Sequence, residues 1–151
     1  MEIKILNKRI PANLGIAWLA LCLSLAVHVI DETLTGFLSV YNPIVLSIRK
    51  QWPFIRLPTF TLEVWLVGLI IAFFVLLSLS PFAFRRAKWI GPLCYVFGIV
   101  MLFNGLLHIA GSFYLGESMP GLYSSPLLLV SSLYLLVTTK YSTNSDVTGV
   151  N

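Results

Sequence analysis

The sequence predicts an all-α integral membrane protein, a four-helix bundle with an interfacial or re-entrant segment between its first and second spans. Of the 151 residues, 58% are hydrophobic and 11% are charged, whereas a soluble domain carries about 25% charged residues. The mean hydropathy is +0.89. Four apolar runs are long enough to cross the hydrocarbon core of a bilayer. The length allows one domain, expected over residues 1–140.

The charges and cysteines narrow the class of protein further. The net charge is +4, and the basic residues flank apolar runs instead of covering an aromatic-rich surface. That distribution is typical of membrane topology signals and argues against a nucleic-acid partner. Cys22 and Cys94 each lie alone in an apolar run, so we expect small buried side chains and no disulfide framework or zinc ribbon.

The first apolar run, residues 14–30, follows the basic residues Lys4, Lys8 and Arg9. A basic start before an apolar core is also what a secretory signal peptide looks like. This run lacks a small-x-small exit, because its end leads straight into His28 and two acidic residues. We therefore predict a retained first span.

Prolines and basic side chains interrupt the next stretch, residues 33–61. They are Pro43, Arg49, Lys50, Pro53, Arg56 and Pro58. The charges argue against a complete span here, and aromatic residues such as Tyr41 and Trp52 are typical of the headgroup level. We expect an interfacial or re-entrant segment at residues 36–48, placed to cover a site from the outer side.

The second and third spans are predicted over residues 62–79 and 89–114. Glu63 lies in the first turn of the second span, where the helix dipole alone favours a carboxylate. The third span carries glycines seven residues apart, which indicates a face for close helix packing. They are Gly91, Gly98 and Gly105.

The fourth span is predicted over residues 122–139, and a polar tail, residues 141–151, is expected to be disordered. Four spans place both termini and the loop between the second and third spans on one side. That side collects Lys4, Lys8, Arg9, Arg85, Arg86, Lys88 and Lys140. The positive-inside rule therefore predicts cytoplasmic termini, with the cell membrane as the expected location.

Two groups of polar residues interrupt the apolar spans. His28, Asp31 and Glu32 share one helical face at the end of the first span, because residues three and four apart are neighbours on a helix. Asn104 and His108 repeat the four-residue spacing in the third span, and the two histidines are the only ones in the chain. Ionisable residues inside a membrane span are costly, so we expect them to form one catalytic site.

The predicted topology brings Glu63 and Glu117 to the same outer depth as these residues. A structural interpretation remains open, in which the carboxylates face water at the membrane boundary and each histidine bonds a neighbour. Asn104 and His108 fit that interpretation less well, since both lie well inside an apolar run.

These residues resemble the HXXEE-domain family of small multi-span membrane proteins. Residues 28–32 match its naming motif, with Asp31 in place of the first Glu, and Asn104 and His108 match its second signature. The Pro120-Gly121 turn follows, as in the family. The turn at residues 116–118 departs from the family, which has a basic residue and Tyr there. The resemblance implies the fold and the site, and it implies no particular activity.

An enzyme acting on a lipid or other apolar small molecule is the first hypothesis, with proton transfer or hydrolysis as its chemistry. Glu32 or Asp31 would orient His28, and Asn104 and His108 would face it across the bundle. Asn104 would hold a developing oxyanion or a water molecule.

A divalent metal, Zn²⁺ or Fe²⁺, is a variant of the same hypothesis. Its expected ligands are His28, Glu32, His108 and Glu63, because bundle metal sites use His and Glu from facing helices. Two alternatives stay open: a small-solute or proton-coupled transporter, and a non-catalytic interaction subunit. The sequence shows neither the inverted repeat nor the continuous polar path that a transporter would be expected to have. The bilayer is the expected surrounding, and an oligomer is compatible with the sequence.

Overall fold

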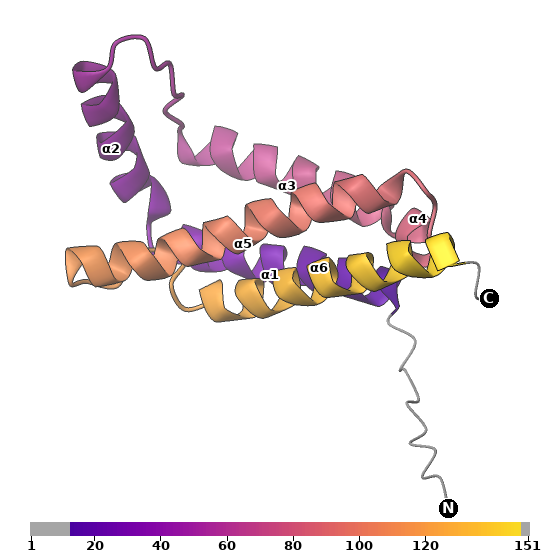
Figure 1. Ribbon diagram of the computed structural model, residues 1–151. Helices are drawn as coiled ribbons and strands as arrows, with labels where there is room; N and C mark the ends of the chain where they lie inside the picture. The colour runs from indigo at the N-terminus through magenta and orange to yellow at the C-terminus, as the bar shows by residue number, and fades with distance from the viewer. Residues whose placement is uncertain (1–12, 149–151) are drawn as a thin grey trace, which may run out of the picture.

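Helix α1 (Leu14–Leu34) runs through the middle of the molecule (Figure 1). The computed structural model describes residues 13–148, with side chains described as far as Ser142. Asn13 caps α1, because its side-chain oxygen accepts hydrogen bonds from the backbone N–H groups of Gly15 and Ile16. The helix is 21 residues long, and half of the residues in its apolar stretch are buried in the protein.

The described residues contain further helices and no strand. They are α2 (Phe37–Gln51), α3 (Leu62–Ser78), α4 (Ser80–Phe84), α5 (Ile90–Leu115) and α6 (Ser125–Thr148). In this part of the chain, three segments are long and apolar enough to cross a membrane: Leu14–Leu34, Leu62–Phe84 and Ile90–Leu115. Their bounds lie close to the first three predicted spans. The all-helical class is therefore confirmed for the described residues, and three of the expected segments are helices apolar enough to span a membrane.

Helices α1, α5 and α6 pack together along their lengths (Figure 1). Their shared core is fully buried at Trp18, Leu21, Leu128 and Leu135. The Trp18 ring lies 5.1 Å from the Phe97 ring of α5. Burial of large side chains on three helices therefore fixes the positions of the elements that carry the polar residues.

Two of the three glycines predicted as a packing face, Gly98 and Gly105, face α6, whereas a Cβ added at Gly91 would meet nothing within 4 Å. A Cβ added at Gly98 would lie 2.8 Å from the Leu136 side chain, and one at Gly105 would lie 3.1 Å from the Leu129 side chain. Small α6 residues at Ser125 and Ser132 present their backbone carbonyls to these two glycines. The helices therefore approach closely because both lack bulk at the contact.

Helix α3 lies at the edge of this group, and none of its residues is buried. Its main tie to α1 is the Trp18 indole N–H, which donates to the Leu76 carbonyl over 3.0 Å. After Ser78 the chain turns once and continues as α4, where Ser80 and Ala83 are buried. The Ser80-Pro81 pair therefore redirects the chain without ending its helical path.

Helix α2 covers the residues predicted as an interfacial or re-entrant segment and leans away from the other helices (Figure 1). A two-way contact holds it to the segment before α3: the Asn42 amide donates to the Phe60 carbonyl and accepts from the Phe60 N–H. The Tyr41 hydroxyl donates to the Pro58 carbonyl over 3.0 Å. Pro43 lies inside α2 without ending it.

The element order gives the molecule two distinct ends (Figure 1). At the α2 end, α1 and α5 finish while α3 and α6 begin. At the α4 end, the described chain starts and finishes, beside the turn between α4 and α5. Helix α6 continues to Thr148, past residue 140 where the polar tail was expected to begin, and residues 149–151 lie outside the described part.

Candidate functional site

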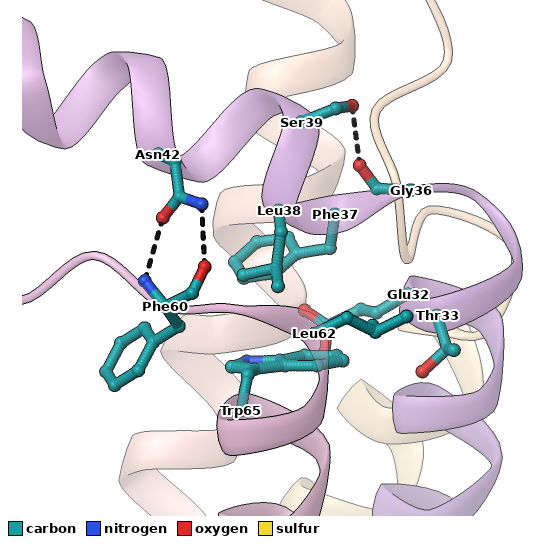
Figure 2. A pocket seen from close by; sticks show the side chains of 10 residues that line it. All are labelled: Glu32, Thr33, Gly36, Phe37, Leu38, Ser39, Asn42, Phe60, Leu62 and Trp65. Carbon is teal, nitrogen blue, oxygen red and sulfur yellow. Dashed lines mark hydrogen bonds between the residues drawn. The ribbon is translucent and has the colours of Figure 1, made fainter.

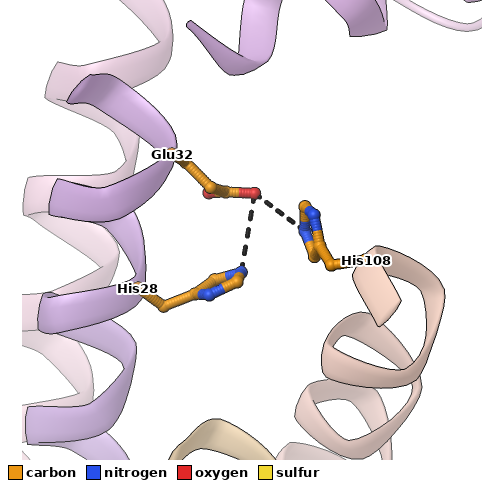
Figure 3. Close-up of side chains that lie close together, drawn as sticks. All are labelled: His28, Glu32 and His108. Atoms are coloured by element: carbon orange, nitrogen blue, oxygen red, sulfur yellow. Dashed lines mark ion pairs between the residues drawn. The ribbon is translucent and has the colours of Figure 1, made fainter. Parts of the chain in front are cut away.

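Three side chains from two helices meet at the α2 end of the molecule. The Nε2 atom of His108, on α5, lies 3.1 Å from Glu32 Oε1, and the Nε2 atom of His28 lies 3.6 Å from the same oxygen. Figure 3 shows Glu32 between the two imidazoles. We call these three residues the His–Glu cluster. His28 is 0% exposed, and Glu32 and His108 are each 5% exposed, so bulk water does not reach most of their polar atoms.

Helical spacing explains how the cluster forms. His28 and Glu32 are four residues apart on α1, which places both on the face that packs toward α5 and α6. His108 comes from the last turns of α5, and its ring centroid lies 4.8 Å from that of His28. The sequence predicted this convergence, and the structure brings all three together.

Asp31 reaches the cluster through one intermediary, Ser124, in the turn before α6. The Ser124 hydroxyl lies 2.7 Å from Asp31 Oδ2, and the Ser124 N–H donates to the same oxygen over 2.8 Å. The same hydroxyl lies 2.8 Å from His28 Nδ1. Asp31 therefore positions His28 through the serine, whereas the sequence predicted that Asp31 or Glu32 would orient it directly.

This chain of contacts assigns the proton on His28. A hydroxyl has one hydrogen, and Ser124 directs it at the Asp31 carboxylate, so Ser124 accepts a hydrogen bond from His28 Nδ1–H. The Nε2 atom then points at two oxygens, Glu32 Oε1 and Asn104 Oδ1, the latter over 3.3 Å. A cation bound between these groups, or an Asn104 amide turned so that its NH₂ group faces Nε2, would give this nitrogen a favourable partner.

The donor set fits a divalent cation. One ligand atom from each member of the His–Glu cluster can be chosen so that all three lie within 4.8 Å of one another. Neighbouring ligand atoms of a tetrahedral zinc ion lie about 3.3 Å apart, given bonds of about 2.0–2.1 Å. Two imidazoles and one carboxylate are the protein ligands of catalytic zinc and of non-haem iron sites, both of which leave coordination positions open.

Aromatic rings shield the His108 side of the cluster. The Phe37 ring, at the start of α2, lies 5.9 Å from the His108 ring and stacks at 5.7 Å on Trp65 of α3. The Nδ1 atom of His108 is buried and has no hydrogen-bond partner within the described part of the chain. Leaving such a nitrogen unpaired costs about 1–3 kcal/mol. Ser80 Oγ and Thr138 Oγ1 are also buried without a partner in the described part of the chain, so this feature alone does not mark the site.

Gly121 closes the cluster from the α6 side. Its backbone is left-handed, with φ +82°, and an added Cβ would lie 2.9 Å from His28 Cε1. The same Cβ would lie 3.0 Å from Glu32 Cγ and 3.0 Å from His108 Cε1. Only glycine fits both the conformation and the space. The backbone of the turn therefore forms a wall of the site.

A cavity of about 400 Å³ adjoins the cluster at Glu32. It lies between α1, α2 and α3, and its walls are mainly apolar and aromatic (Figure 2). Phe37, Phe60 and Trp65 line it, and the Asn42–Phe60 contact forms one edge. Glu32 thus has one side in the His–Glu cluster and one side on the cavity.

Glu63 and Glu117 do not belong to this site. Both are exposed, Glu63 in the first turn of α3 and Glu117 just after α5. The expectation that Glu63 would be a metal ligand is not supported, because it is absent from the group of residues that can share a metal ion. Its place beside the Thr61 cap agrees with the helix-dipole role instead.

Sequence reasoning missed Ser124 altogether and noted Gly121 only as part of a turn. Ser124 lies 93 positions from Asp31 in the chain, and no local pattern signals such a contact. The proline before Gly121 and the serine pair after it were the only signal, since a Pro-Gly turn leading into a helix marks a backbone that must bend sharply.

The fold and the cluster define a small all-helical protein with three helices apolar enough to span a membrane and a buried two-His, one-Glu site. Residues 18–135 match the family described as "Protein of unknown function with HXXEE motif". The match covers most of the chain and includes every member of the site, and the chain belongs to this family. No curated protein and no solved structure matches the chain.

Proposed function

We propose that this protein is a membrane-embedded enzyme that hydrolyses a lipid or other apolar substrate, with a divalent metal held by the His–Glu cluster. The observation that carries the proposal is the convergence of two imidazoles and one carboxylate, all buried, beside an apolar cavity. Structural histidines at a helix end need no cavity and no shared carboxylate.

The proposed setting is a four-span bundle. Helices α1, α5 and α6 and the α3–α4 pair would cross the bilayer, with both termini in the cytoplasm and α2 at the outer surface of the cell membrane. The basic residues at the α4 end support this orientation through the positive-inside rule. Helix α6 would cross with its serines and threonines turned to the protein interior, where Ser131, Ser132, Thr138 and Thr139 are buried.

Each residue of the cluster has a distinct proposed role. His28, Glu32 and His108 would hold the metal, which when bound supplies a Lewis acid and makes water acidic enough to be a nucleophile near neutral pH. Asp31 and Ser124 keep His28 in the tautomer that presents its Nε2 lone pair. Asn104 places a polar amide beside that nitrogen, where it can orient the reacting group.

The cavity supports the substrate class. A space of about 400 Å³ lined by Phe37, Phe60 and Trp65 suits a hydrocarbon chain better than a sugar or a peptide. Thr33, Ser39 and Asn42 add neutral polar groups to the lining, and Glu32 adds the charge among the described residues. Its carboxylate would lie beside the reacting bond of a bound lipid. Since α2 and the segment before α3 form its outer wall, movement of this pair would admit the substrate.

Ester hydrolysis by the purified full-length chain in detergent micelles tests the proposal. We expect p-nitrophenyl esters with eight-carbon acyl chains to react faster than the acetate ester, because the longer chain fills the cavity. Glu32→Gln should lower the rate by about a hundredfold or more, because it removes a proposed metal ligand and even the loss of a group that supports a ligand costs about 10–100-fold. Glu63→Gln changes an exposed carboxylate at the same end and is the matched control.

The proposal fails if the wild type hydrolyses no ester of either length with its metal content restored. It also fails if Glu32→Gln and Glu63→Gln behave alike. A transporter is the second candidate, favoured by the buried contact of 2.7 Å between Ser24 and Ser131, which extends polar character toward the α4 end. Against it, Ser24 lies 2.8 Å from the Ala20 carbonyl of its own helix, an interaction that needs no transport path.

A further inference from the structure

A second cavity, of about 420 Å³, lies at the α4 end, opposite the His–Glu cluster. The turn between α4 and α5 forms one wall, and the start of α1, the first turns of α5 and the last described side chains of α6 form the others. Among the residues that the structure describes, two cations line it, Arg86 and Lys88, and no carboxylate does. The described lining therefore carries charges of one sign.

Polar donors accompany the two cations. The Tyr95 and Ser142 side chains line the same cavity. Lys88 and the Tyr95 hydroxyl have no ion pair or hydrogen bond within the part of the chain that the structure describes. The positive end of the α5 dipole adds to the potential of the two cations. A ligand that brings several acceptor oxygens and negative charge is therefore favoured in this cavity.

The surroundings of the cavity are those of a membrane interface. Trp89, which precedes α5, is 52% exposed, and its ring lies 5.0 Å from that of Phe82. Exposed aromatic rings at the end of apolar helices are typical of the headgroup level. Two buried apolar side chains, Leu14 and Ile90, also line the cavity. The lining thus combines exposed basic side chains with buried apolar ones, as suits the headgroup and upper chain of a lipid.

We propose that this cavity binds the phosphate of an anionic phospholipid, with Arg86 and Lys88 as its cationic ligands. Basic pockets between membrane helices on the cytoplasmic side take such headgroups. The positive-inside rule alone would also explain basic residues in this turn. It does not predict a cavity, however, and it gives no reason why Arg86 and Lys88 line one while Arg85 does not. Arg85 is exposed and lies outside the cavity lining, which provides a matched control.

The test measures stabilisation of the delipidated full-length protein in detergent by added lipid. Dioleoyl phosphatidylglycerol is titrated against dioleoyl phosphatidylcholine, and the melting temperature gives the affinity through ligand linkage. The variants are Lys88→Gln and Arg86→Asn, with Arg85→Gln and Lys140→Gln as controls. Asn suits position 86 because the backbone there has φ +50°, a conformation that Asn tolerates.

We expect saturable stabilisation by phosphatidylglycerol and none by phosphatidylcholine. Each cavity variant should weaken the affinity about fivefold, the value of one basic residue at an anionic surface, while each control changes it less than twofold. Equal effects in all four variants would overturn the proposal, because they indicate a diffuse surface charge. Glycerol phosphate, a soluble compound with the same phosphate group, is titrated in parallel. If it binds as tightly as phosphatidylglycerol, the assignment of a lipid ligand is overturned. The cavity variants should leave the metal content unchanged.

Discussion

Replacing Gly121 with alanine perturbs the His–Glu cluster without replacing any of its side chains. The change adds one methyl group, which would meet His28, Glu32 and His108 at 2.9–3.0 Å. Two costs add. Alanine at φ +82° costs about 1–2 kcal/mol in backbone strain. Crowding a packed site costs about 1–3 kcal/mol more. We therefore expect a loss of about 2–5 kcal/mol in unfolding free energy.

Gly116→Ala separates the two costs. Gly116 is also left-handed, with φ +68°, but an added Cβ there has nothing within 4 Å. Thermal melts of both variants in the same detergent measure the difference, which we expect to be about 1–3 kcal/mol. Metal content measured in parallel should fall in Gly121→Ala and stay unchanged in Gly116→Ala. Equal melting temperatures and equal metal content would refute the inference that the turn backbone forms a wall of the site.

Three further predictions concern packing, positioning and topology. Gly98→Leu should lower the free energy of unfolding by about 1–3 kcal/mol or more, because the larger side chain overpacks the contact with α6. Gly91→Leu should leave the stability nearly unchanged, because a Cβ at Gly91 has nothing within 4 Å. Thermal melts of the two variants in the same detergent make the comparison. Ser124→Ala should weaken metal affinity about 10–100-fold by freeing the His28 ring, and competition with a chelator measures the change. A reporter active only in the cytoplasm should be active when fused after Lys140 and silent after Glu117, and the reverse pattern would contradict the proposed orientation.

The sequence predicted the cluster because its geometry is local. Four-residue spacing fixed His28 and Glu32 on one helical face, and chain reversal at each turn brought His108 to the same end. Composition alone located three helices that are apolar enough to span a membrane, because a run of about twenty apolar residues is typical of a membrane-spanning helix. The role of the α5 glycines also followed from spacing, because Gly98 and Gly105 must share a face.

The remaining features depend on contacts that no local pattern encodes. Helix α3 is apolar on all sides, so its sequence does not show which face turns inward, and Glu63 turned out to be exposed. The Ser124 bridge joins two turns separated by most of the chain. The sequence predicted that Pro43 interrupts the apolar stretch, yet α2 continues through it. Pro43 is exposed, so water can reach the carbonyl that the missing proline N–H leaves without a donor.

Metal analysis of the detergent-purified full-length protein tests the central claim most directly. Samples are loaded with zinc or with ferrous iron, washed on a column and quantified by plasma mass spectrometry. We predict about one ion per wild-type chain, about one in Glu63→Gln, and almost none in Glu32→Gln or His108→Ala, provided that all four proteins remain folded by circular dichroism. A wild-type protein that retains no metal, or cluster variants that retain as much as Glu63→Gln, would contradict the account.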